Sequence, residues 1–128
     1  MKELTLEWIQ KAEGDYHSAL RDYRARNHPN YDSAGFHAQQ CVEKYLKAIL
    51  QENNIRFQKV HDLLALMQLC LSVDSQLKIH KDILADLNPF AVVFRYPGEY
   101  ATKQDAKAAI QALKTLRVYL RQVLGIES

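Results

Sequence analysis

Residues 31–53 read YDSAGFHAQQCVEKYLKAILQEN, and this stretch decides the fold. Its apolar side chains recur every three to four residues, which is the spacing of one face of an α-helix. They form a broad stripe: Ala34, Ala38, Cys41, Val42, Tyr45, Leu46 and Ile49. Gly35 costs up to about 1 kcal/mol of helix propensity relative to alanine. We interpret Gly35 either as a mark of close packing by another backbone or as a first-turn glycine of little cost.

Helical spacing continues on both sides of this stretch. It predicts a first helix over about 6–24, a shorter and more apolar helix over 61–71, and a fourth helix from about 74 to 88. Pro29 and Pro89 end the first and fourth of these patterns, because proline disfavours helical geometry at the residue before it. The sequence therefore predicts several helices and no other type of secondary structure.

The last predicted helix has the clearest start and end. Thr102 stands three residues before Asp105, which is a variant of the capping box, and the apolar stripe that follows stops at Gly125. Just before it, Pro97 and Gly98 predict a turn or loop over 94–100. Four or five helices with short connections predict an all-α fold, an antiparallel four- to five-helix up-and-down bundle, in a single domain over 1–128.

Composition supports this fold class and excludes several others. The 128 residues include only 4 glycines and 3 prolines, and 48% of the residues are hydrophobic, which fits a globular protein of few, long elements. The formal net charge of +2 supplies no strong field for nucleic acid. Cys41 and Cys70 lie in apolar helical surroundings, so we expect free, buried thiols.

The sequence contains no pattern typical of a metal, a cofactor or a membrane anchor. Its five histidines and two cysteines have no metal-ligand spacing, and its glycines form no phosphate-binding loop. No apolar run approaches the roughly 20 residues that span a bilayer. We therefore expect a cytoplasmic protein without metal, cofactor or membrane contact.

Four blocks of the sequence together resemble the HEPN domain family. Residues 36–50, FHAQQCVEKYLKAIL, resemble the second-helix signature of that family, which often reads FH.QQ..EK.LKA.L. Three other blocks agree in order: the first-helix positions Trp8, Ala12, Asp15 and Ala19, the triplet His61-Asp62-Leu63, and the stretch from Leu87-Asn88 to Arg95-Tyr96-Pro97. Val60 stands where the family commonly has threonine. The resemblance covers nearly the whole chain.

The resemblance implies a helical homodimer in which Arg-containing segments of two protomers share one cleft. Many members of the family are metal-independent ribonucleases, often toxins encoded beside a minimal nucleotidyltransferase antitoxin. Their chemistry uses an arginine followed four to six residues later by a histidine. The arginine binds the scissile phosphate and the histidine moves a proton.

Arg95 matches the arginine of this pattern, but the histidine is absent. The window after it reads Tyr100, Ala101 and Thr102. We interpret Arg95 as a phosphate-binding residue, the alternative being a surface arginine that pairs with Glu99 or caps the end of the fourth helix. The resemblance also implies Tyr100 as a catalytic candidate and as an acceptor of AMP transferred by the nucleotidyltransferase.

Four further residues are candidates for binding RNA or a nucleotide. Tyr96 either stacks on a base or closes the end of the bundle. His37 and His61 either replace the missing base or are structural. Lys44 lies with Gln39, Gln40 and Glu43 on a polar face that meets a partner, lines the cleft or is solvated.

Three functions therefore remain open at the level of sequence. The first is a ribonuclease toxin in a two-gene system, and the second is a catalytically degenerate module that binds a nucleotide or a protein partner. The third is a helical adaptor whose polar groups form only its surface.

Overall fold

The computed structural model describes residues 1–127, and these form five α-helices and three 3-10 turns without a β-strand. The α-helices are α1 (Glu3–Arg24), α2 (Tyr31–Glu52), α3 (Leu63–Cys70), α4 (Lys81–Leu87) and α5 (Lys103–Val123). The turns are η1 (Ser75–His80), η2 (Asn88–Ala91) and η3 (Val93–Arg95). The all-α prediction is confirmed.

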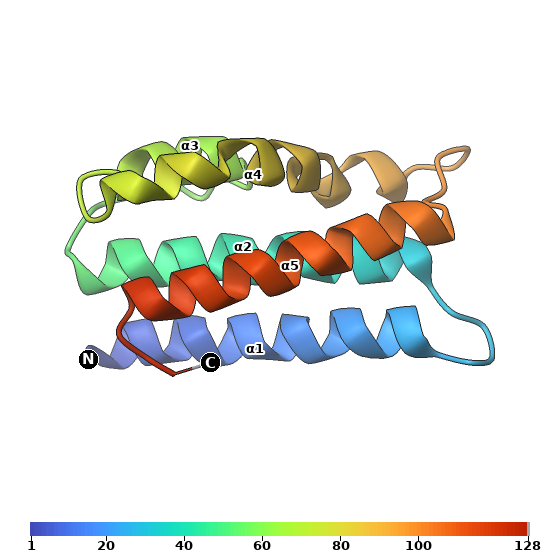
Figure 1. Cartoon of the computed structure of the whole chain (residues 1–128), viewed down its shortest axis with the longest axis horizontal. Helices are drawn as coiled ribbons and strands as arrows, with labels where there is room; N and C mark the ends of the chain where they lie inside the picture. Colours follow the sequence, from blue (N-terminus) through green and yellow to red (C-terminus); the bar gives the residue numbers. More distant parts are fainter. Residues whose placement is uncertain (128) are drawn as a thin grey trace.

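The helices surround α2. Figure 1 shows α1 and α2 as a long antiparallel hairpin, the α3–α4 segment along the opposite side of α2, and α5 crossing in front of it. The segment from η1 to η3 runs against the direction of α2, and α5 runs back again, as in an up-and-down bundle (Figure 1).

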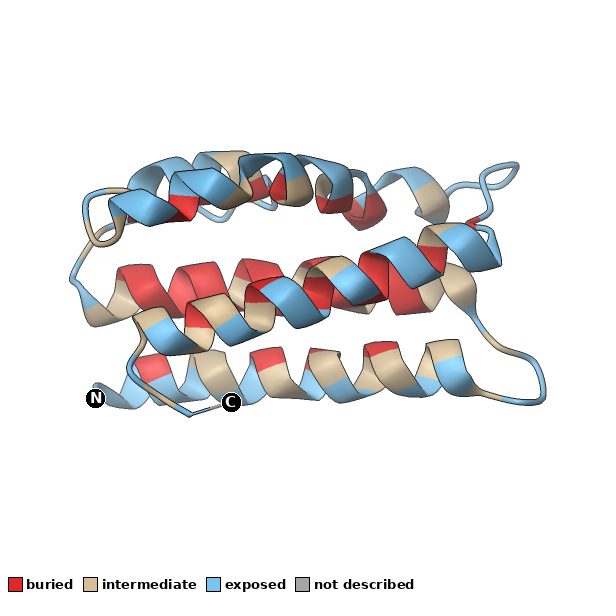
Figure 2. Ribbon diagram, viewed as in Figure 1, coloured by how far each residue is buried: buried red, intermediate tan, exposed pale blue. Residues whose placement is uncertain are grey.

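The central position of α2 makes it the most buried helix (Figure 2). Its apolar stripe packs against α1 and α5, and the core includes fully buried Tyr45, Leu46 and Ile49. Cys41 and Cys70 are free and buried, as predicted. Burial raises the pKa of the Cys41 thiol well above its ordinary value and that of Cys70 to about 12, so both thiols stay protonated.

The fourth predicted helix is wrong in one respect, because it is not continuous. The side chain of Asp74 accepts a hydrogen bond from the Gln76 N–H and starts η1, and α4 follows only from Lys81. At the far end Pro89 stands at the first turn of η2, which ends α4. The turn or loop predicted over 94–100 is present: the 3-10 turn η3 ends at Arg95, and a turn at Pro97 and Gly98 follows.

Side-chain caps fix the starts of α2, α3 and α5. Asp62 caps α3 by accepting the Leu64 N–H at 2.9 Å. Thr102 and Asp105 form the predicted capping box of α5. None of the helices in residues 1–127 is both long enough and apolar enough to cross a membrane.

Candidate functional site

Arg95 lies at the end of η3 with its side chain exposed. Its guanidinium carbon is 5.5 Å from the centroid of the Phe36 ring, a position that allows a cation–π contact. No carboxylate within residues 1–127 forms a salt bridge with it, so the expected alternative of a pair with Glu99 is not found. The charge of Arg95 is therefore available to an anion from outside the chain.

A pocket of about 360 Å³ opens beside Arg95. One wall is polar and comes from Asn30, Asp32 and Ser33, at the start of α2. The other wall is aromatic and comes from Phe36, Phe90 and Phe94. The sequence resemblance pointed to Arg95, but not to this pocket, because Phe90 and Phe94 are about sixty residues from the α2 residues that complete it.

Three contacts hold the polar wall in place. Asp32 accepts the Ala101 N–H on Oδ1 at 2.6 Å. The Ser33 hydroxyl donates to Asp22 at 2.5 Å, and the Ser33 N–H donates to Asn30 Oδ1 at 3.0 Å. Asp32 therefore joins the start of α2 to the residue just before the cap of α5.

The aromatic wall depends on Gly35. A Cβ at that position would lie 2.2 Å from Phe90 Cδ1, far inside van der Waals contact. Phe90 is consequently buried against the backbone of α2, and the Phe94 ring packs on it with centroids 5.0 Å apart. Gly35 does mark close packing, but the neighbour is an aromatic side chain rather than another backbone.

His37 belongs to a cluster between α1 and α2. Its Nδ1 lies 2.7 Å from Asp15 Oδ1, and because a carboxylate only accepts, Nδ1 carries the proton. Lys44 donates to the other oxygen of Asp15 at 2.5 Å. Burial by itself raises the pKa of Asp15, but the hydrogen bonds from His37 and Lys44 outweigh it and hold the pKa below its ordinary value.

The His37 ring and Arg95 have one neighbour in common, the Phe36 ring. The centroid of the His37 ring is 5.5 Å from the centroid of Phe36, the ring over which Arg95 lies. The side chain is 29% exposed, and the Asp15 contact leaves its Nε2 without a partner among the described residues. The structure thus brings a free guanidinium and a carboxylate-held imidazole to one aromatic side chain.

His61 occupies a second cluster, further along α2. Its Nδ1 donates to Glu43, with the nearer oxygen at 3.1 Å, and Lys47 donates to the same carboxylate at 3.0 Å. Gln39 donates to the His61 carbonyl at 2.9 Å. Glu43 and Gln39 are almost fully buried, so the alternative that this polar face is solvated is wrong for these two residues.

Tyr96 and Tyr100 are both strongly exposed, and no described residue forms a hydrogen bond with either hydroxyl. They flank the turn at Gly98, whose φ of 93° is easily adopted only by glycine. No hydrogen bond within the described residues links Tyr100 to Arg95. A nearby apolar patch is also exposed and includes Val92 and Val93.

A further ionic network has no counterpart in the sequence analysis. Glu13 of α1 accepts two hydrogen bonds from Arg117 of α5, at 2.5 and 2.8 Å, and one from the Tyr45 hydroxyl at 2.6 Å. Arg121 donates to the same hydroxyl at 2.7 Å. Burial alone raises the pKa of Glu13, but these hydrogen bonds outweigh it and lower the pKa. The network joins α1, α2 and α5, and residues 104 positions apart leave no pattern that predicts it.

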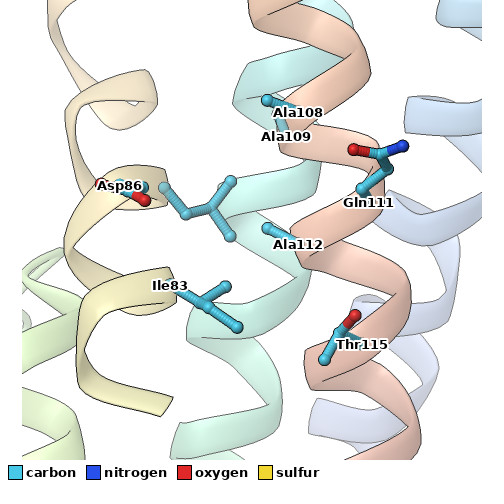
Figure 3. Close-up of a pocket in the computed structure, with 8 residues that line it drawn as sticks. Ile83, Asp86, Ala108, Ala109, Gln111, Ala112 and Thr115 are labelled. Carbon is cyan, nitrogen blue, oxygen red and sulfur yellow. The ribbon is translucent and has the colours of Figure 1, made fainter.

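A second depression, of about 270 Å³, lies between α4 and α5. Figure 3 shows Ile83 pointing from α4 toward α5, with the small side chain of Ala112 opposite. No cation or aromatic ring lines it. It offers no cation to bind a phosphate and no ring on which a base could stack, in contrast to the Arg95 pocket. Within residues 1–127, no three metal-ligating side chains gather.

Comparisons with known proteins agree with the resemblance seen in the sequence. The model of the HEPN domain matches residues 5–123. A crystal structure described as an archaeal HEPN homologue superposes with a TM-score of 0.73 and 24% sequence identity, covering 96% of this chain and 99% of that chain. Since the identity is low, this likeness shows the fold alone. No curated protein matches the chain.

Proposed function

The chain belongs to the HEPN domain family, and from that premise we propose that it is the toxin of a two-gene toxin–antitoxin system and cleaves RNA without a metal ion. Arg95 binds the scissile phosphate, because a guanidinium donates two parallel hydrogen bonds to phosphate oxygens and stabilises the charge that develops on them. RNA in the cytoplasm is the substrate.

One observation carries the proposal: an unpaired Arg95 and an Asp15-held His37 contact the same Phe36 ring. His37 then supplies the proton transfer that the family assigns to the histidine missing after Arg95. A carboxylate that accepts from Nδ1 fixes the tautomer and leaves Nε2 to take the proton of a 2′-hydroxyl. Lys44 on the second oxygen of Asp15 holds this carboxylate in place.

His61 and Tyr100 are weaker candidates for the proton carrier. His61 is held by Glu43 in the second cluster, and no described contact links it to Arg95 or to Phe36. Tyr100 is strongly exposed, and no described hydrogen bond or ion pair links it to Arg95. Its exposure suits the other role implied for it, acceptor of AMP from a minimal nucleotidyltransferase antitoxin.

A homodimer fits the surface around Arg95. Val92, Val93 and Tyr96 are exposed next to it, and such apolar groups commonly mark a protein interface. A second protomer on this surface would place two Arg95 side chains in one cleft and supply phosphate contacts that a single protomer lacks.

The test is cleavage of total tRNA and a long RNA by the purified protein in EDTA. We expect cleavage by the wild type, its loss in Arg95→Ala, and no change in Arg26→Ala, which removes the same charge from an exposed loop position. His37→Asn is expected to lower the rate about 100-fold or more, the usual contribution of a general base. Cleavage that survives Arg95→Ala would refute the assignment.

A second function, a binding module without catalysis, is favoured by the absence of a histidine in the window after Arg95. This function is supported if neither the wild type nor Arg95→Ala cleaves RNA and mass spectrometry finds no AMP on the wild type. An AMP-carrying protein is first treated to remove the modification and then assayed again.

A further inference from the structure

The pocket beside Arg95 has the chemistry of a base-binding site. It joins a free cation to an aromatic wall and to a polar wall with free hydrogen-bonding groups. Its volume of about 360 Å³ lies at the small end of the range for ligand sites. Proteins that bind unpaired RNA bases use this combination: the base stacks on a ring, and its polar edge meets side chains.

The carboxylate of Asp32 is fixed and only partly used. Its Oδ1 accepts the Ala101 N–H, which fixes the side chain at the pocket wall. No donor in residues 1–127 forms a hydrogen bond with Oδ2. A carboxylate has about four acceptor positions, so Asp32 can still accept from two neighbouring N–H groups of a ligand.

Asn30 supplies the complementary group. Its Oδ1 already accepts the Ser33 N–H, which orients the amide and leaves the amino group to donate. The Ser33 hydroxyl gives its own hydrogen to Asp22. The polar wall therefore presents acceptors at Asp32 and a donor at Asn30.

Among the four RNA bases, guanine alone carries two adjacent donors, N1–H and the 2-amino group, next to a carbonyl acceptor at O6. Adenine and cytosine each present one amino group beside a ring nitrogen that would face the Asp32 carboxylate with its own lone pair. Uracil presents one N–H between two carbonyls. Only guanine matches two acceptors followed by a donor.

We infer that the pocket is a guanine subsite. The base lies against Phe94 and Phe36, Asp32 accepts from N1–H and the 2-amino group, and Asn30 donates to O6. This rests on the proposed function in that Arg95 binds the phosphate of the same nucleotide. The RNA is consequently bound with a guanosine beside the phosphate that Arg95 holds.

The experiment measures nucleotide binding, so that it does not depend on cleavage. The affinities of GMP, IMP, AMP and CMP are measured by titration calorimetry in EDTA. IMP differs from GMP only in lacking the 2-amino group. We expect GMP to bind at least about fivefold more tightly than IMP, since a two-point contact to a base discriminates by that much or more. Equal binding of GMP and IMP would overturn the inference.

The Asp32→Asn variant is expected to lose one nucleotide preference and to gain another. The amide oxygen can still accept the Ala101 N–H, so the fold keeps that contact, while the new amino group opposes N1–H and the 2-amino group of guanine. The variant is expected to lose the preference for GMP over IMP and to prefer XMP, whose C2 carbonyl accepts from the new amide. An unchanged GMP preference in this variant would count against the site.

Two controls complete the design. Asp86→Asn makes the same change at the depression between α4 and α5 and is expected to leave the GMP preference intact. Phe94→Leu is expected to weaken all nucleotides about tenfold without changing their order, because stacking is insensitive to the base. If RNA is not cleaved but GMP is preferred, the proposed cleavage chemistry fails and the guanine subsite stands. If RNA is cleaved but GMP and IMP bind equally, the cleavage chemistry stands and the guanine subsite fails.

Discussion

Substituting alanine for Gly35 tests the packing that forms the aromatic wall of the pocket. The new methyl group would start 2.2 Å from Phe90 Cδ1 and 2.6 Å from Cε1, whereas ordinary contact begins at 3.4 Å. The ring must therefore retreat by about 1 Å. Phe90 is buried beneath α2 and has little room to do so.

Gly14 provides the matched control. It lies in α1, is exposed, and a Cβ there would meet no atom within 4 Å. Both substitutions gain helix propensity of about 1 kcal/mol, so this gain cancels in the difference between them. Overpacking costs about 1 to 3 kcal/mol. Gly14→Ala is therefore expected to stabilise the protein, and Gly35→Ala to be about 1 to 3 kcal/mol less stable than Gly14→Ala.

Urea unfolding followed by circular dichroism measures both free energies of unfolding. A Phe90→Leu background then identifies the source of the cost, because a smaller, more flexible side chain relieves the contact. In that background Gly35→Ala and Gly14→Ala should agree within about 0.5 kcal/mol. The reasoning is refuted if the two substitutions already agree in the wild type, or if their difference survives Phe90→Leu.

Three more predictions concern ionic contacts and caps. Asp15→Asn should cost most stability at neutral pH. The folded protein lowers the pKa of Asp15, so the ionised carboxylate stabilises the fold at pH values above the unfolded pKa of about 3.9, and this stabilisation is lost as the pH falls through the folded pKa. The urea midpoints of wild type and variant should therefore converge at acid pH. Arg117→Lys should cost about 1 to 3 kcal/mol, because lysine cannot donate the paired hydrogen bonds to Glu13, and a double-mutant cycle with Glu13→Gln should show coupling. Thr102→Ala should cost about 1 kcal/mol in thermal unfolding through loss of the α5 cap, and an unchanged melting temperature would contradict the capping role.

The long helices were predictable because each carries its own periodic signal. Residues 31–52 form one helix as expected, and the first helix begins at Glu3, three residues before the predicted start at Leu6. The fourth predicted helix failed because periodicity does not distinguish an α-helix from successive 3-10 turns. The spacing of apolar residues was sufficient to predict the long helices, but it was ambiguous for the fourth predicted helix.

The candidate site was predictable only where the family resemblance fell on a single residue. Arg95 was identified from a motif. The contact between Asp32 and Ala101 spans 69 positions and has no sequence signal. The Glu43 cluster was misjudged as a possible solvated face, because a polar residue on a helix gives no sign that another segment covers it.

The segment Asn88–Arg95, which contains η2 and η3, is expected to be less stable locally than the long helices. Its short 3-10 turns have poorer hydrogen-bond geometry than the long α-helices, so we expect its amide hydrogens to exchange earlier than those in α1, α2 and α5. Such an opening would remove Phe90, Phe94 and Arg95 together while the three long helices stay folded. A ligand in the pocket would slow exchange in this segment and in the first turn of α2, and the pattern of protected amides would map the site without any measurement of activity.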